Sequence, residues 1–173
     1  MRYSIFIRGK IAGMVGGLAG TFAMYLFGAG IFALLGWPAN TSLSIIGDSA
    51  AAFFSELGIV LTGGVSLGMW VYYLIGLIMG AVFGLAVVSL EPLRRASLRK
   101  RVVLSIVYVE VLSVPLLVAG TLALGMEAAA ALLWFSISFV MHLVYGLVLG
   151  LVTSYGVGNV VQDRSVLHPD QMG

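Results

Sequence analysis

Long apolar segments alternate with short polar segments along this chain, and four of the apolar segments exceed the roughly 20 residues that a helix needs to cross a bilayer. The four predicted spans are residues 11–36, 65–90, 102–124 and 128–155. The polar segments are an outer connection at 37–64, a basic loop at 91–101 and a tail at 156–173. Because backbone polar groups in lipid must be paired within each segment, this pattern predicts an all-α integral membrane protein, a four-helix transmembrane bundle in a single domain, 1–173.

Positive charge is confined to the two ends of the chain and to one loop. The nine Lys and Arg residues lie at 2–10, at 94–101 and at Arg164, and the apolar segments between them contain none. Membrane insertion retains Lys and Arg on the cytoplasmic side. We therefore predict that the N and C termini and the loop 91–101 are cytoplasmic, and that the connection 37–64 faces outward.

The outer connection contains a predicted short helix. Asp48 begins a run of small and aromatic residues that ends at Gly58, so we expect a helix at 48–58 with Asp48 as its N-terminal cap. Such a helix either packs as a surface helix on the mouth of the bundle or forms a lid over a cavity. Tryptophan favours the headgroup level of a membrane. Three tryptophans are therefore expected near this outer side: Trp37, Trp70 and Trp134.

The composition agrees with a membrane location. Hydrophobic residues make up 61% of the chain and charged residues 9%, against about 25% charged residues in soluble domains. The net charge is only +2, so the lipid bilayer, with anionic headgroups near the basic loop, is a better expected partner than a nucleic acid. The sequence contains no cysteine, which excludes disulfides and thiolate metal sites.

Small residues recur every four positions on three of the predicted spans. This spacing lets neighbouring helix backbones approach closely. The predicted helix-packing glycines are Gly13, Gly17, Gly20, Gly76, Gly80, Gly84, Gly146 and Gly150. They either pack the four helices against one another or present a docking face to another membrane protein subunit or to a second copy of the chain.

Two ionisable residues fall inside the predicted spans. Glu110 lies about 12 Å from the inner end of the third span, and His142 lies near the middle of the fourth. Ionisable residues at such depth usually face the bundle interior and are paired. We therefore predict an intramembrane polar site that contains Glu110 and His142, with Tyr108 and Tyr145 as hydrogen-bonding neighbours. Such a site is a structural clamp, a proton- or ligand-linked site or, for His142, a haem ligand.

The sequence contains none of the motifs that mark common catalytic chemistry. A phosphate-binding loop, an HExxH zinc motif, a nucleophile elbow and paired intramembrane aspartates are all missing. We therefore expect a protein that is not an enzyme and that requires no metal and no cofactor.

A short internal repeat bears on how the predicted helices are paired. The segment 72–80 matches the segment 142–150 at an offset of 70 residues, and both lie on helices predicted to run inward. The match arises either from two parallel helical hairpins or from chance between helices rich in Gly and Leu.

The segments Gly17–Met24 and His142–Gly150 together resemble a family of small uncharacterised prokaryotic membrane proteins with four spans, common in haloarchaea. That family carries a GxxGTxxM-like start and an HLxYGxxLG-like end, and the likeness covers the first and last predicted helices. The resemblance implies a multi-pass protein of a prokaryotic cell membrane. It also marks Thr21, His142 and Tyr145 as positions that match the pattern, and it brings no established activity.

Two functional hypotheses follow. The first is a structural or accessory subunit that packs against other membrane subunits, or against itself, through glycine-rich helix faces. The alternative is a small transporter or proton-coupled permease that uses Glu110 and His142, with the helix at 48–58 as an outer gate. A permease requires a continuous polar cavity that reaches Glu110, whereas a subunit does not.

Overall fold

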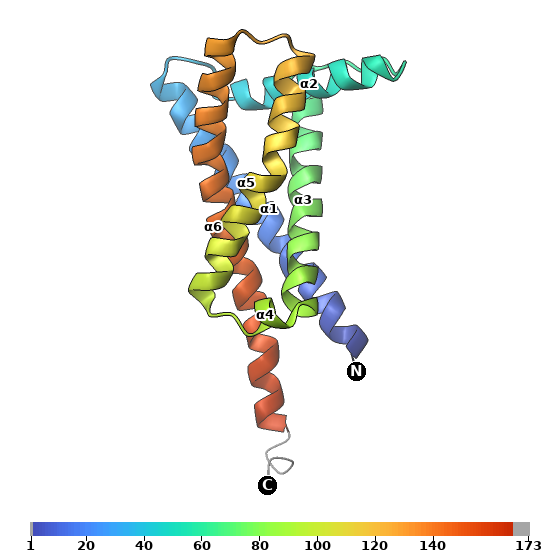
Figure 1. Cartoon of the computed structure of the whole chain (residues 1–173), viewed down its shortest axis with the longest axis vertical. Coiled ribbons are helices and arrows are strands. Elements are labelled where there is room, and N and C mark those ends of the chain that lie inside the picture. Colours follow the sequence, from blue (N-terminus) through green and yellow to red (C-terminus); the bar gives the residue numbers. More distant parts are fainter. Residues whose placement is uncertain (1, 168–173) are drawn as a thin grey trace.

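A computed structural model of the chain describes residues 2–167, and the regular structure within this range is entirely helical (Figure 1). The helices are α1 (Arg2–Leu34), α2 (Thr41–Glu56), α3 (Gly64–Ser89), α4 (Glu91–Arg94), α5 (Leu98–Ala123) and α6 (Ala128–Leu167). Among the described residues, four helices are long and apolar enough to cross a membrane, namely α1, α3, α5 and α6. The predicted all-α architecture with four membrane-length helices is confirmed.

The two ends of the bundle differ in what covers them. α2 lies across one end, which we call the α2 end, and the short α4 lies at the opposite end, the α4 end (Figure 1). α1 and α5 run toward the α2 end, whereas α3 and α6 run toward the α4 end. The start of α1 and the last turns of α6 therefore lie at the same end of the molecule as α4.

The long helices form an open row and not a closed ring. α1 packs along both α3 and α6, and α5 packs along α6. Within residues 2–167, α3 and α5 make few contacts with each other, although only α4 and its flanking loops separate them in the sequence. α2 packs against α3 and more lightly against α5, so it bridges the gap between these two helices at the α2 end.

Glycines set the close approach of α1 and α3. A Cβ atom placed on Gly80 would lie 2.7 Å from the Cα atom of Gly17, and one placed on Gly84 would lie 2.7 Å from the Cα atom of Gly13. Both separations are shorter than real Cβ contacts, so the two backbones touch with no room for a side chain between them. Small residues permit this backbone contact, which supplies van der Waals packing in a lipid environment.

The other predicted packing glycines also lie between helices of this chain. Gly20 faces α6, Gly76 faces α1, and Gly146 and Gly150 face α5. All eight predicted glycines therefore pack against other helices of the same chain.

Two further glycines, Gly47 and Gly68, lie outside the predicted set. They bring α2 against α3, because a Cβ atom on Gly47 would lie 2.8 Å from the backbone nitrogen of Gly68. Gly30 provides a contrast, since a Cβ atom added to it would meet no atom within 4 Å and the residue is exposed.

The helix in the outer connection is longer than predicted. α2 begins at Thr41 and ends at Glu56, whereas the sequence favours a helix at 48–58. Asp48 is consequently inside the helix and is not its cap. Its Oδ1 atom accepts a hydrogen bond of 2.7 Å from the backbone N–H of Gly64, the first residue of α3. The earlier start allows the turn that contains Leu43 to be buried against α3.

The first and last helices also extend past the predicted spans. α1 begins at Arg2 instead of residue 11, and α6 continues through residues 156–167 of the predicted tail. Both extensions lie at the α4 end, where polar sequence continues the helix beyond the apolar segment (Figure 1). Residues 168–173 of the predicted tail lie outside the described residues.

The tryptophans only partly follow the prediction. Trp37 and Trp70 are exposed near the α2 end, which suits the headgroup level. Trp134 is only 8% exposed and points into the bundle. Trp134 lies in the first turns of α6, toward the α2 end as expected, but its ring packs inside the bundle and does not face the surroundings.

The basic loop at the α4 end is held by local contacts. The guanidinium of Arg101 donates hydrogen bonds to the carbonyl oxygen atoms of Leu93, at 3.1 Å, and Arg94, at 2.7 Å. Arg95 forms an ion pair with Glu91. These contacts fold the loop back against the start of α5 and leave the neighbouring Arg99 exposed.

Candidate functional site

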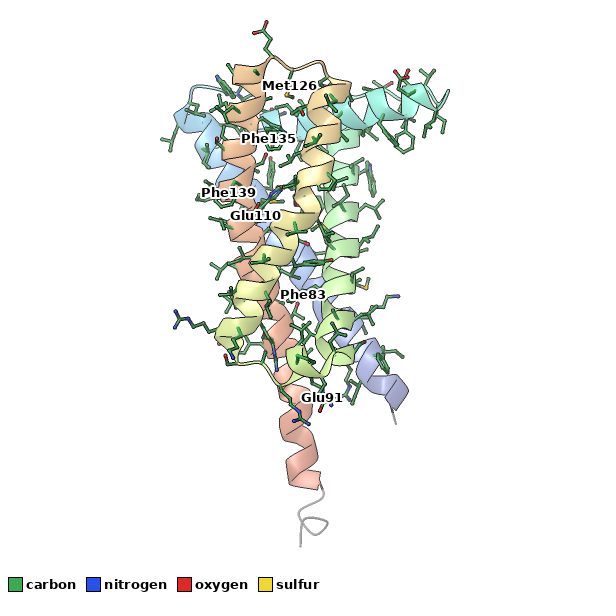
Figure 2. All side chains as sticks on the ribbon, viewed as in Figure 1. Phe83, Glu91, Glu110, Met126, Phe135 and Phe139 are labelled. Atoms are coloured by element: carbon green, nitrogen blue, oxygen red, sulfur yellow. The ribbon has the colours of Figure 1, made fainter. Side chains whose placement is uncertain are left out.

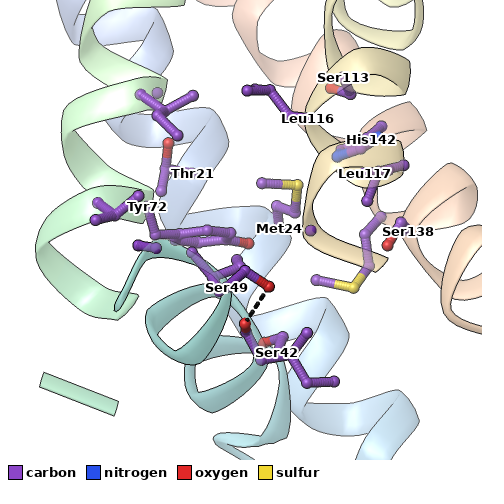
Figure 3. A pocket seen from close by; sticks show the side chains of 18 of the residues that line it. Thr21, Met24, Ser42, Ser49, Tyr72, Ser113, Leu116, Leu117, Ser138 and His142 are labelled. Atoms are coloured by element: carbon purple, nitrogen blue, oxygen red, sulfur yellow. Dashed lines mark hydrogen bonds between the residues drawn. The ribbon is translucent and has the colours of Figure 1, made fainter. Parts of the chain in front are cut away.

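A cavity of about 450 Å³ lies beneath α2, in the space between α3 and α5 (Figure 3). Residues of α1, α2, α3, α5 and α6 all contribute to its lining. The volume falls in the range of about 300–1,000 Å³ that is typical of small-molecule pockets. The cavity exists because α3 and α5 make few contacts with each other and no long helix fills the gap between them.

The cavity opens sideways, toward the surroundings of the bundle. Three residues line the cavity and are also more than half exposed: Phe53 on α2 (56%), Leu74 on α3 (56%) and Leu116 on α5 (53%). We call these three residues the portal. In a membrane their exposed faces would contact lipid chains. In a membrane, the portal would therefore face lipid chains and not bulk water.

A hydrogen bond closes the cavity toward the α4 end. The hydroxyl of Tyr108 on α5 donates to the carbonyl oxygen of Met79 on α3 at 3.0 Å. The Tyr108 ring also packs against Phe83, with 5.5 Å between the ring centroids. Met79 itself lines the cavity. The gap between α3 and α5 is therefore limited to the half of the bundle nearest α2.

One face of α2 forms the cover. Its lining residues recur at helical spacing and are Ser42, Ile45, Ile46, Ser49, Ala50, Phe53 and Phe54. Apolar and small residues at positions i, i+3, i+4, i+7 and i+8 mark one face of an amphipathic helix. α2 consequently lies over a cavity, which is the geometry of a lid, one of the two arrangements expected for this connection.

The lining is mainly apolar and carries hydroxyl groups. None of the described lining residues is Asp, Glu, Lys or Arg. Several hydroxyls are paired with backbone within the chain: Thr21 donates to the carbonyl of Gly17 at 2.8 Å, and Ser49 donates to the carbonyl of Ile45 at 2.7 Å (Figure 3). Such internal bonds use the O–H donor of each hydroxyl and leave only its oxygen lone pairs as acceptors.

Two of the lining hydroxyls have buried oxygen atoms and no hydrogen-bond partner among the described residues. They are the Oγ atom of Ser42, whose residue is fully buried, and the OH group of Tyr72, whose residue is 7% exposed. A buried polar group without a partner costs about 1–3 kcal/mol. Both hydroxyls belong to residues that line the cavity, but their oxygen atoms are buried among protein atoms and do not face its open space.

Glu110 on α5 lies near the middle of the bundle (Figure 2). His142 on α6 lies next to it. The Nδ1 atom of His142 is 3.6 Å from the Oε2 atom of Glu110, and their side chains are 14% and 20% exposed, respectively. This distance exceeds that of a hydrogen bond, so the contact is electrostatic. His142 lines the cavity and Glu110 does not, so Glu110 lies behind the imidazole as seen from the cavity.

The two predicted tyrosine neighbours have other partners. Tyr145 donates a hydrogen bond of 2.8 Å to the carbonyl oxygen of Gly76, and Tyr108 donates to Met79 as described above. Both acceptors are backbone groups of α3. The structure therefore brings together Glu110 and His142, and it uses the tyrosines to tie α6 and α5 to α3.

Ser42 and Tyr72 are site residues that lie outside the predicted set. For Ser42 a signal exists, because Ser42, Ser49 and the residues between them repeat at helical spacing along one face of α2. For Tyr72 no local signal exists, since its neighbours along the span are apolar or aromatic and its importance comes from the cavity beside it. Among the described residues, no three His, Cys, Asp or Glu side chains form a metal-binding cluster.

No family model matches this chain, and no curated protein or solved structure gives a significant match to it.

Proposed function

We propose that this chain is a non-enzymatic, multi-pass protein of a prokaryotic cell membrane that binds a lipophilic small molecule in the cavity beneath α2. One observation carries the proposal: an apolar cavity of about 450 Å³ inside a bundle of membrane-length helices opens through an apolar portal toward the lipid. A molecule dissolved in the bilayer can enter such a cavity sideways, without crossing water.

The proposed orientation places the α4 end in the cytoplasm. Arg8, Lys10 and the basic residues of the loop 94–101 lie at that end, together with the start of α1 and the end of α6. The cytoplasmic retention of Lys and Arg favours this choice. α2 and its cavity then lie in the outer half of the membrane, close to the exposed Trp37 and Trp70.

Two helical hairpins of the same orientation form part of this proposal. α1 with α3 is one pair and α5 with α6 is the other, and in each pair the inward-running helix supplies glycines to the contact. Gly76 and Gly80 do so on α3, and Gly146 and Gly150 do so on α6. The offset match of the segments 72–80 and 142–150 agrees with a parallel repeat.

Membership of the four-span prokaryotic family remains a proposal, supported by the two matching segments. The accessory-subunit hypothesis also remains a proposal. The glycines support this hypothesis less than their spacing in the sequence suggests. All eight of them pack helices of this chain against one another, so none is free to contact another subunit.

Native mass spectrometry of the protein released from mild detergent tests the proposal. We expect the wild-type chain to retain a small lipophilic molecule and Ala119→Trp to lose it, because Ala119 lines the cavity on α5 and an indole there would fill the space. Val118→Trp is the matched control, since Val118 is adjacent, exposed and outside the lining. A wild-type chain without a bound molecule, or an equal loss in both variants, would contradict the proposal.

A second candidate function is proton-coupled transport, favoured by the position of His142. This residue lines the cavity and also lies 3.6 Å from Glu110, so the imidazole borders the cavity and the carboxyl group lies next to the imidazole, outside the lining. Intramembrane acid and histidine residues are common parts of proton pathways. The mainly apolar lining counts against a continuous polar route.

Proton uptake into proteoliposomes, driven by an imposed membrane potential and followed with an enclosed pH-sensitive dye, tests this second candidate. Transport through the pair predicts uptake that Glu110→Gln abolishes. Glu127→Gln is the control, because Glu127 is exposed in the turn between α5 and α6. Uptake no faster than in empty liposomes would exclude the candidate.

A further inference from the structure

We infer that the cavity takes up a lipophile with an uncharged hydroxyl head, which forms hydrogen bonds with His142 and with the hydroxyl of Ser113 or Ser138. This inference rests on the proposed function, because it names the class of ligand that the same cavity binds. Three features carry it: polar atoms that are open to the cavity, the carboxyl group of Glu110 behind His142, and a described lining without Lys, Arg, Asp or Glu.

The side of the cavity formed by α5 and α6 carries polar atoms that the protein leaves free. Ser138 and His142 lie one turn apart on α6, Ser113 lies on α5, and Figure 3 shows these three residues, the polar wall, on the same side of the cavity. Their Oγ and Nε2 atoms have no hydrogen-bond partner among the described residues, yet they are not sealed among protein atoms. Both serines are more than nine-tenths buried and line the cavity, so their accessible oxygens face its open space.

Glu110 determines which hydrogen bond the imidazole of His142 offers to the cavity. Its Oε2 atom lies 3.6 Å from Nδ1 of His142, behind the imidazole as seen from the cavity. A neighbouring carboxylate favours a proton on the nearer ring nitrogen, so Nε2 is left as an acceptor. The head of the ligand must therefore donate a hydrogen bond to Nε2.

A hydroxyl head matches the polar wall. It donates its proton to Nε2 of His142 and accepts a hydrogen bond from Ser113 or Ser138, whereas a carbonyl head only accepts and a hydrocarbon does neither. A charged head of either sign would find no counter-charge, because the described lining contains no Lys, Arg, Asp or Glu. Since an unpaired charge within a membrane is costly, a neutral head is favoured.

The portal leads a hydrocarbon chain to the polar wall. Phe53, Leu74 and Leu116 form an apolar rim that is more than half exposed to the surroundings of the bundle. Leu116 lies one turn after Ser113 on α5, so the rim and the polar wall adjoin along that helix. A chain that crosses the rim from the lipid therefore brings its terminal hydroxyl to the polar wall.

Competition for photocrosslinking in nanodiscs tests the inference. The probe is hexadecanol with a diazirine in its chain, and the part of the crosslink that Ala119→Trp abolishes reports on the cavity. The competitors are unlabelled hexadecanol, a methyl ketone of similar chain length, hexadecane and hexadecyl phosphate. We expect hexadecanol to compete at a concentration about fivefold lower than the ketone, the factor of one net hydrogen bond, and to exceed hexadecane and the phosphate by more.

Variants of the polar wall separate its two kinds of hydrogen bond. In His142→Leu the advantage of hexadecanol over the ketone should vanish, because no acceptor remains for its proton. In the double variant Ser113→Ala with Ser138→Ala, hexadecanol and the ketone should both compete less well. Unchanged competition by hexadecane shows that the cavity of each variant is intact, and if His142→Leu does not fold, the double serine variant decides.

Ser136→Ala is the matched control and should keep the wild-type preferences, because Ser136 is exposed on α6, donates to the carbonyl of Leu132 and does not line the cavity. Equal competition by hexadecanol and the ketone in the wild type would overturn the inference, as would wild-type preferences in every folded variant of the polar wall. If all compounds compete equally for a crosslink that Ala119→Trp abolishes, the cavity binds lipophiles and only the head recognition is wrong. If Ala119→Trp leaves the crosslink intact, the proposed function fails together with the inference.

Discussion

The hydroxyl of Tyr145 on α6 donates a hydrogen bond of 2.8 Å to the carbonyl oxygen of Gly76 on α3. At the same glycine, Thr21 of α1 packs so closely that an added Cβ atom would overlap its hydroxyl oxygen. Three helices therefore meet at one residue, and all three of these residues line the cavity. Thr21 and Tyr145 also belong to the two segments that resemble the four-span family. These segments of α1 and α6 therefore both contact α3 at Gly76.

Loss of this hydrogen bond should have a small but measurable effect on stability. Tyr145→Phe removes only the hydroxyl oxygen, and interhelical hydrogen bonds in membrane proteins contribute about 0.6 kcal/mol on average and up to about 1.7 kcal/mol. We expect a decrease of that size in the free energy of unfolding, measured by denaturant titration in mixed micelles. Tyr155→Phe is the control, because Tyr155 lies on the same helix and is 63% exposed. Equal effects of the two variants would show that the bond contributes nothing.

The contact between α1 and α3 should not tolerate a methyl group. In Gly80→Ala the new Cβ atom would overlap the carbonyl oxygen of Gly13, so the two helices must separate. Overpacking of this kind costs about 1–3 kcal/mol. Gly30→Ala on α1 meets open space and should be neutral or slightly stabilising, because alanine favours a helix over glycine. Thermal unfolding in detergent should show a lower Tm for the first variant only, and equal Tm values would contradict this packing.

The number and the approximate spans of the long helices could be predicted because hydropathy alone determines them. Their arrangement could not, because in lipid an outward face and a packed face are both apolar. Leu74 is 56% exposed and Leu149 is fully buried, yet the residue type is the same. No periodicity in the sequence therefore reveals the gap between α3 and α5. α2 differs, since one of its faces covers the cavity and the serines and apolar residues of that face recur at helical spacing.

The candidate site was predictable only in part for a related reason. Glu110 and His142 stand out because ionisable residues are rare within membrane spans, and the structure places them 3.6 Å apart. The partners of Tyr108 and Tyr145 are backbone carbonyl groups. Every residue has a carbonyl group, so such acceptors leave no trace in the sequence and depend wholly on the packing of α3.

Glu110 and His142 should be energetically coupled. Their side chains are largely buried and 3.6 Å apart, so replacement of either one leaves the other without its electrostatic partner. A double-mutant cycle with Glu110→Gln and His142→Gln should give a coupling free energy on the order of 0.5–3 kcal/mol, the range for residues in contact. The control cycle combines Glu110→Gln with Tyr155→Phe and should be additive. Additivity in both cycles would mean that the proximity has no energetic consequence.

The contact of Asp48 with Gly64 should hold α2 over the cavity. The Oδ1 atom of Asp48 accepts a hydrogen bond of 2.7 Å from the N–H of Gly64, which joins α2 to the start of α3. Asp48→Ala removes the acceptor, and amide hydrogen exchange in α2 and in residues 57–63 should accelerate. Asp48→Asn keeps a carbonyl acceptor and should largely restore protection. Glu56→Ala, at the exposed end of α2, is the control, and protection unchanged in Asp48→Ala would rule out this tether.

The orientation of the bundle can be tested with single cysteines, because the natural chain contains none. Ala96→Cys places a thiol in the loop at the α4 end, and Thr62→Cys places one in the exposed connection before α3. Since basic loops are retained in the cytoplasm, a membrane-impermeant maleimide should label Thr62→Cys in intact cells and label Ala96→Cys only after permeabilisation. Labelling of Ala96→Cys in intact cells would invert the bundle, and the portal beneath α2 would then open into the inner leaflet.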